Sequence, residues 1–211
     1  MNLASSLSTR LAFAEISDTT RIALAEVRPF VMDVLPGVLD DFYQFLAQFP
    51  EVNRHFGTPA VKDRAKNAQI AHWAMLLSGS FDEQYVQSAQ RIGEVHHRLG
   101  LEPQWYIGGY KKLLASLLGR VETGVTSHWP SKMLLVKKAA MIDALVSVIM
   151  LDMDFVISVY FEAGKREKLA TLQQLSDKFE QSIGQIAGRV ASMSEDLRTA
   201  ADRLTSTAKE T

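Results

Sequence analysis

The chain has 211 residues, enough for one domain with an appendage or for two small domains. Hydrophobic residues make up 47% of it and charged residues 22%, which is typical of a folded globular protein and argues against disorder over the whole length. The 23 basic and 24 acidic residues give a formal net charge of −1, so no basic field favours nucleic-acid binding. With 0 cysteines, disulfides, thiolate metal sites and cysteine nucleophiles are excluded.

Helices are predicted along almost the whole chain. Hydrophobic periodicity and the Gly and Pro breaks place them at 18–34, 36–47, 59–77, 82–98, 102–122 and from 131 onward. Asp18, Asp82 and Ser131 are candidate N-caps, and Pro36 and Pro103 suit the first turn of a helix. Since no run of residues alternates with a period of two, we expect no strands and an all-α fold.

The apolar stretch 139–161 has the length of a membrane span, but it contains Asp143, Asp152 and Asp154. Carboxylates near the middle of a lipid-facing helix are costly. We therefore expect this helix to be buried between protein surfaces, and we expect no membrane span.

The last predicted helix continues far beyond a compact domain. From Leu169 to Leu204 its apolar residues recur mostly at steps of three or four, which is typical of a coiled coil. One helix with a single apolar stripe needs a partner. A second copy of the chain is the simplest partner, and the alternative is a helix that folds back on the first domain. Because the pattern still runs at the last residues, we expect a further C-terminal domain.

His96 is the main candidate for binding chemistry. It shares an apolar side of its predicted helix with Ile92 and Leu99. An imidazole on such a stripe needs a hydrogen bond or a metal, and haem iron is one possible partner. Spacing alone leaves a purely structural histidine as the alternative. His72, seven residues after Ala65 and on a similar helix face, is the rival axial ligand.

No catalytic motif competes with this site. The sequence has no Gly-x-Ser-x-Gly, Walker loop, dinucleotide glycine fingerprint or His-Glu-x-x-His. We therefore expect a protein that is not an enzyme.

Several motifs together resemble the globin-coupled sensors, the haem-based aerotactic transducer family. The segment RIGEVHHRLGLEPQWYIGGY, residues 91–110, resembles their proximal-histidine helix and the turn that follows it. Upstream, His72-Trp73, Ser78-Gly79 and Phe81-Asp82-x-x-Tyr85 match at preserved distances, and Asp41-Phe42-Tyr43 matches the distal tyrosine segment. The resemblance covers 18–161. It implies a globin-like fold with an N-terminal extension and a long C-terminal helix that continues into a coiled coil.

The resemblance also implies haem b, iron protoporphyrin IX, as the cofactor. Position by position, His96 matches the proximal iron ligand and Tyr43 the distal donor to bound dioxygen, while Ala65, Ala68 and Gln69 fall on the distal side. The expected cofactor contacts are Phe42, Phe56, His72, Ile92, Leu99, Trp105 and Tyr106. An aromatic wall residue with its hydroxyl capped by a carbonyl is the alternative for Tyr43, and a packed core tyrosine is the alternative for Tyr106.

The tail resembles the helix that leads into the signalling domains of methyl-accepting chemoreceptors. The implied organisation is an extension at 1–17, a globin sensor domain at 18–165 and a coiled-coil linker at 166–211. The implied protein is a cytoplasmic homodimer that binds dioxygen or another diatomic gas and reaches a chemotaxis kinase complex through the missing C-terminal domain. The alternatives are a globin sensor for a histidine kinase or a diguanylate cyclase, and a globin-like regulatory module without haem. A haem enzyme would need a reductase or a polar distal acid–base pair, and neither is evident.

Overall fold

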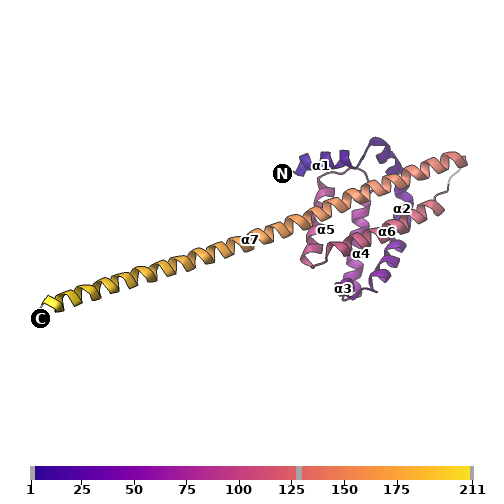
Figure 1. Cartoon of the computed structure of the whole chain (residues 1–211). Coiled ribbons are helices and arrows are strands. Elements are labelled where there is room, and N and C mark those ends of the chain that lie inside the picture. The colour runs from indigo at the N-terminus through magenta and orange to yellow at the C-terminus, as the bar shows by residue number, and fades with distance from the viewer. Residues whose placement is uncertain (1–2, 127–129, 210–211) are drawn as a thin grey trace. The chain divides into compact units, whose positions relative to one another are not determined.

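The computed structural model describes residues 3–126 and 130–209, and every regular element in these ranges is an α-helix (Figure 1). The helices are α1 (Leu3–Phe13), α2 (Asp18–Leu46), α3 (Pro50–Asn53), α4 (Pro59–Leu76), α5 (Glu83–Arg98), α6 (Pro103–Gly124) and α7 (Ser131–Lys209). The predicted all-α class is therefore confirmed. The chain divides into an N-terminal unit, Met1–Ala163, and a C-terminal unit, Gly164–Thr211. His128 lies outside the described residues.

Helix α2 corrects one predicted boundary. Pro36 was expected to start a new helix, but α2 runs through both Pro29 and Pro36 without a break. A proline inside a helix costs about 3 kcal/mol. Here the buried face continues on both sides of Pro36 at Leu35 and Val38, and burying each large apolar side chain contributes about 1.5–3 kcal/mol. Packing against the core therefore outweighs the local preference for a break.

The N-caps show a second correction. Asp82 caps α5 as predicted, since its carboxylate accepts the Tyr85 backbone N–H at 3.1 Å. The cap of α2 is Ser17 and not Asp18: the Ser17 hydroxyl accepts the Thr20 N–H, and the Thr20 hydroxyl accepts the Ser17 N–H. This reciprocal pair satisfies two backbone donors, which a lone carboxylate at position 18 would not do.

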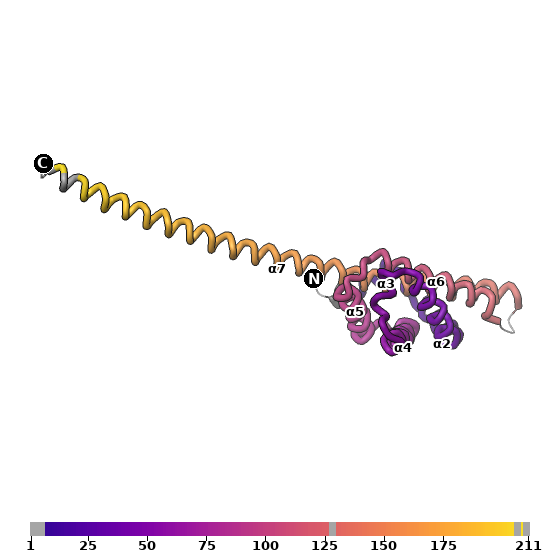
Figure 2. Tube along the Cα trace, turned by 90° about the horizontal axis from the view of Figure 1, so that it is seen from below, coloured from indigo at the N-terminus to yellow at the C-terminus, as the bar shows by residue number. Residues whose placement is uncertain are grey.

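The core of the N-terminal unit lies where α2 packs on α6 and α4, and where α4 packs on α5. Helix α6 and the first part of α7 lie side by side (Figure 2), and the Lys138 ammonium donates to the Glu122 carbonyl between them. The buried apolar residues of α2 include Leu24, Val27, Val31, Leu35, Val38, Leu39 and Phe42. This one amphipathic helix therefore supplies a continuous wall of the core.

The apolar part of α7 belongs to that core. An 18-residue window of this helix is apolar enough to cross a membrane by length and composition. Its buried residues are Met141, Ala144, Leu145, Val148, Ile149, Leu151, Asp152, Phe155 and Val156. Helix α1 contacts the same stretch through Arg10, whose guanidinium pairs with Asp154, donates to Ser158 and lies over the Phe155 ring. The expected burial between protein surfaces is thus seen in the structure.

The C-terminal unit is helical through residue 209. Its large apolar residues, named here the C-terminal stripe, are 49% to 72% exposed: Leu169, Leu172, Leu175, Phe179, Ile183, Ile186, Val190, Met193, Leu197 and Leu204.

Candidate ligand-binding site

His96 lies near the end of α5, and its ring is fixed by the backbone. The Nδ1 atom is 2.7 Å from the carbonyl oxygen of Ile92, one turn earlier. A carbonyl only accepts, so Nδ1 carries the hydrogen and Nε2 keeps a free electron pair. Burial lowers the pKa of His96 and a neighbouring charge at His55 lowers it further, while the bond to Ile92 opposes them. The site therefore favours the neutral tautomer in which Nε2 can bind a metal.

One aromatic ring contacts His96, and aliphatic residues precede and follow it along the chain. The Tyr106 ring meets the imidazole edge-on, with 5.1 Å between the ring centres. On α5, Val95 is 39% exposed and Leu99 is 43% exposed, whereas Ile92 packs against the core. Exposed aliphatic side chains on the same helix as a metal-competent nitrogen suit a large apolar group that carries a metal.

Gly93 lets α5 approach α7 closely. A Cβ atom at this position would lie 2.7 Å from Val159 Cβ and 3.1 Å from the Val156 carbonyl oxygen. Only a residue without a side chain fits this crossing, three positions before His96.

Tyr43 and Gln69 form a polar pair on α2 and α4. The Tyr43 hydroxyl donates to Gln69 Oε1 at 2.9 Å, and burial raises the pKa of Tyr43 well above its ordinary value. The phenol therefore stays protonated. Its ring contacts Phe42 and Phe56 edge-on, at centre distances of 5.5 Å and 5.2 Å. The hydroxyl is therefore capped by a carbonyl oxygen, as in the alternative considered for Tyr43, and this oxygen belongs to a side-chain amide and not to the backbone.

The other predicted distal residues lie on α4. Ala65 is partly buried against the core, and Ala68 is exposed. Lys62, one turn before Ala65, places its ammonium 5.5 Å from the centre of the Tyr43 ring. Trp105, an expected cofactor contact on α6, packs on Phe49 with 5.8 Å between ring centres.

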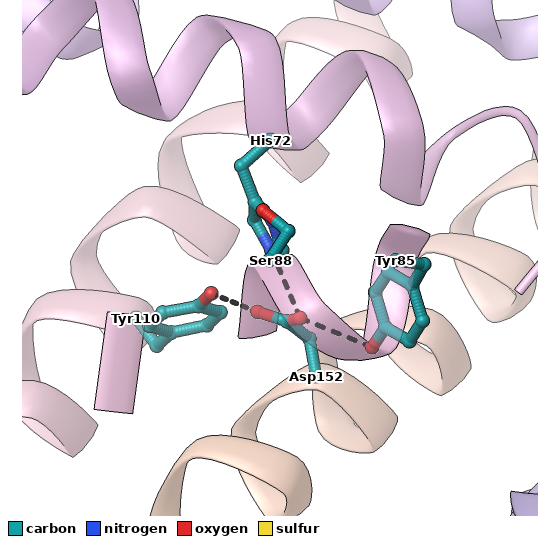
Figure 3. Close-up of polar contacts among 5 residues, drawn as sticks. All are labelled: His72, Tyr85, Ser88, Tyr110 and Asp152. Carbon is teal, nitrogen blue, oxygen red and sulfur yellow. Dashed lines mark hydrogen bonds and ion pairs between the residues drawn. The ribbon is translucent and has the colours of Figure 1, made fainter. Parts of the chain in front are cut away.

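His72 lies in a buried polar network (Figure 3). Its Nε2 donates to Asp152 Oδ1 at 2.9 Å, and its Nδ1 is joined to the Ser88 hydroxyl at 2.9 Å. An axial ligand needs one ring nitrogen for the metal. Both nitrogens of His72 have protein partners here, so neither is available for the axial role in which His72 was the rival of His96.

The rest of this network was not predicted as part of a site. Tyr85 and Tyr110 also donate to Asp152, at 3.0 Å for Tyr85. In the sequence, Asp152 stood out only as a carboxylate inside an apolar helix that we expected to be buried between protein surfaces, and the motifs that contain His72, Tyr85 and Tyr110 gave no sign of a link to it. The structure confirms the burial, since Asp152 is 0% exposed within one chain.

The donor set fits a haem better than a bare ion. Within residues 3–126 and 130–209, no group of three or more His, Asp or Glu side chains is arranged to hold a metal. A bare ion needs several protein ligands, whereas porphyrin iron needs one axial protein ligand. His96, with its free Nε2 and aliphatic neighbours, meets that need.

Comparisons with known proteins agree with this geometry. The sequence profile of the Protoglobin family matches residues 3–166. The chain is 29% identical over 119 residues to the "Heme-based aerotactic transducer HemAT" of Halobacterium salinarum, an alignment covering 56% of this chain and 24% of that protein. The chain thus spans about a quarter of the length of this curated relative.

Solved structures show the same fold. The globin domain of the Geobacter sulfurreducens globin-coupled sensor superposes with a TM-score of 0.63 at 18% identity, over 72% of this chain and 96% of that one. The ferric globin domain of E. coli DosC superposes with a TM-score of 0.59 at 16% identity, over 72% and 99%. The predicted globin-like fold and the resemblance to globin-coupled sensors are confirmed.

Proposed function

The chain belongs to the protoglobin family, and on this premise we propose that its N-terminal unit binds haem b and senses dioxygen or another diatomic gas for a cytoplasmic signal transducer. Haem, when bound, supplies an iron with a coordination position open to a diatomic gas. His96 would hold that iron through Nε2. Phe42, Phe56, Val95 and Leu99 would contact the apolar ring.

The observation that carries the proposal is the bond between His96 Nδ1 and the Ile92 carbonyl. It fixes the tautomer and the ring orientation before any metal arrives, so His96 is preorganised as a ligand. Tyr106, edge-on to the same imidazole, limits its rotation from a second direction.

The direct test is the substitution His96→Ala in the full chain reconstituted with hemin. The wild type is expected to show a Soret band, and the variant is expected to lose it together with stoichiometric haem. His97→Ala is the matched control, since His97 is the next residue on α5 and lies against Tyr160. A normal haem spectrum in His96→Ala contradicts the ligand assignment. A colourless wild type would favour the regulatory module without haem.

On the distal side, Tyr43 and Gln69 would act as a donor pair. The single phenol hydrogen is engaged by Gln69 Oε1, so Tyr43 would donate to a bound gas only by exchanging this bond for one to the ligand, whereas the amide N–H groups of Gln69 are further donors. Donors placed beside a bound gas would stabilise a ligand that gains negative charge, which favours dioxygen over carbon monoxide.

We expect Tyr43→Phe and Gln69→Leu each to raise the dioxygen dissociation rate about 10-fold or more, because a hydrogen bond to a charged group contributes about 1.5–3 kcal/mol. Carbon monoxide dissociation should change less. Stopped-flow kinetics measures both rates. An unchanged dioxygen rate in Tyr43→Phe removes this residue from the donor role.

For the output we propose a homodimer joined along the C-terminal stripe and followed by a chemotaxis signalling domain. The exposure of that stripe within one chain supports a partner helix. The alternative output is a histidine kinase or a diguanylate cyclase. In this proposal the N-terminal unit itself catalyses no reaction. The oligomeric state of the chain tests the homodimer. Fusion of the chain to each class of output domain, with the signalling activity of that domain measured with and without the gas, tests the output.

A further inference from the structure

Asp152 is a buried carboxylate that the proposed binding chemistry does not use. It is 0% exposed, yet it accepts hydrogen bonds from Tyr85 at 3.0 Å, from His72 at 2.9 Å and from Tyr110 (Figure 3). A charge taken out of water is tolerated only when donors replace the lost hydration. Three donors that converge on Asp152 replace this hydration, so the surrounding side chains are arranged to hold a buried carboxylate.

Each donor comes from a different helix. His72 lies on α4, Tyr85 on α5 and Tyr110 on α6, while Asp152 itself lies on α7. One side chain thus joins four helices of the N-terminal unit. Removing it would leave several buried donors without an acceptor, which is costly for each of them.

A row of contacting rings leads from Tyr110 through Tyr106 to His96. The Tyr110 ring lies 4.8 Å from the Tyr106 ring, and the Tyr106 ring lies 5.1 Å from the His96 imidazole. The hydroxyl of Tyr110 is held by Asp152 at the far end. Because packed rings transmit displacement, the position of Tyr110 sets where Tyr106 and then His96 can lie.

A second route leads to the distal pair. His72 is three residues after Gln69 on α4 and therefore one turn further along the helix. Gln69 accepts the Tyr43 hydroxyl. The bond between His72 and Asp152 therefore fixes the axial position of the helix turn that carries Gln69.

We propose that Asp152 is a positioning residue of the binding site: it orients His96 through Tyr110 and Tyr106, holds the Gln69 turn through His72, and ties both sides of the site to α7. The inference rests on the proposed function in taking His96 as the ligand. Beyond the proposed function, the inference assigns Asp152 on α7 as one anchor for both sides of the site, on the helix that continues into the C-terminal stripe.

Tyr85 supplies a matched control. Like Tyr110 it is a buried tyrosine that donates to Asp152, but its ring contacts Phe81, Phe155 and His72, none of which belongs to the row of rings from Tyr110 to His96. Tyr85→Phe and Tyr110→Phe each remove one hydroxyl and one bond to the same carboxylate. They differ in whether the ring involved leads to His96.

The first experiment measures the iron–histidine stretching frequency and the rate of haem loss in the full haem-loaded chain. Tyr110→Phe is expected to shift the frequency and to release haem about 10-fold faster, as for other residues that orient a metal ligand. Tyr85→Phe is expected to leave the frequency at its wild-type value. No shift in Tyr110→Phe, or equal shifts in both variants, overturns the inference.

The second experiment needs no haem. In the haem-free chain labelled with ¹⁵N-histidine, Tyr110→Phe is expected to move the His96 imidazole signals, and Tyr85→Phe is expected to leave them in place. Unmoved His96 signals in Tyr110→Phe contradict the positioning role. A wild type that stays colourless with hemin contradicts the proposed function instead, and this second measurement still decides the role of Asp152.

Discussion

Helix α7 contains two apolar regions that differ in how the chain uses them. Between Met141 and Val156 the apolar residues are buried inside the N-terminal unit, whereas the C-terminal stripe is at least 49% exposed. The first region is apolar on more than one side and includes the buried carboxylate Asp152. The second has one stripe bordered by charged and polar residues. Contact with several helices requires the broad pattern, and contact with one partner helix requires only the narrow one.

High pH is expected to destabilise the N-terminal unit while leaving the C-terminal stripe unaffected, and this is the largest difference that we expect between the two regions. All 5 tyrosines precede residue 161, and burial raises the pKa of Tyr43, Tyr85, Tyr106 and Tyr110. The unfolded chain ionises these phenols near pH 10 while the folded chain keeps them protonated. Stability is therefore full below about pH 10 and falls above it by about 1.4 kcal/mol per pH unit for each such tyrosine.

Tyrosinate absorbance and circular dichroism during an alkaline titration measure this effect. The tyrosines of the N-terminal unit should ionise in one cooperative step together with its unfolding. Gradual ionisation of all 5 residues in a chain that stays folded would contradict the burial of these hydroxyls.

A smaller effect is expected from Asp152→Ala. The substitution leaves three buried donors without their acceptor, and we expect it to lower the free energy of unfolding of the N-terminal unit by about 3–5 kcal/mol. Asp143→Ala, an exposed carboxylate of the same helix, should change it by less than about 0.5 kcal/mol. Denaturant titrations followed by tryptophan fluorescence compare the two variants. Equal losses of stability would contradict the role of Asp152 as the acceptor of three buried donors.

In the C-terminal stripe, Ile183→Glu is expected to weaken association between two copies. Each copy loses about 1.5 kcal/mol of apolar burial, so the dissociation constant of the dimer should rise about 100-fold. Gln185→Glu adds the same charge two positions later, on another side of the helix. Sedimentation equilibrium gives both constants. The stripe has a different role if the two variants associate equally well.

The smallest effect is expected at Gly164, where the two units meet in the sequence. A Cβ at this position has nothing within 4 Å, so Gly164→Ala should stabilise the local helix by about 0.5–1 kcal/mol. Amide hydrogen exchange around residue 164 should slow by about 2–5-fold. Gly100→Ala should destabilise instead, since Gly100 has φ +65°. Faster exchange in Gly164→Ala would show that this glycine serves a bend.

The helix boundaries that the sequence predicted well are those defined by local chemistry. The Asp82 cap, Pro59 and Pro103 mark helix starts with one or two residues, and the structure has α5, α4 and α6 beginning there. Pro36 misled because the packing of α2 on distant helices overrides the local signal. The short α3 was not predicted, since its four residues are too few to show a period, and α1 was missed although Leu3, Leu7 and Leu11 recur at steps of four.

The candidate site residues could be named from the sequence only where a motif marks them. His96 was singled out by its apolar neighbours and assigned as the iron ligand by the resemblance, and Tyr43 was assigned by the resemblance of its segment; both assignments stay predictions. The network of Asp152 was out of reach, because its partners lie 42, 67 and 80 positions away and share no motif with it. The link between Tyr43 and Gln69 spans 26 positions, and only the fold brings the two side chains together.

The crossing at Gly93 leaves no room for a side chain, so any substitution there must move α5 away from α7. Alanine would require the smallest displacement, serine a larger one, and bulkier residues larger ones still. Because α5 carries His96 and α7 carries Asp152, a series of substitutions at position 93 would change the distance between the proposed iron ligand and its proposed anchor in steps.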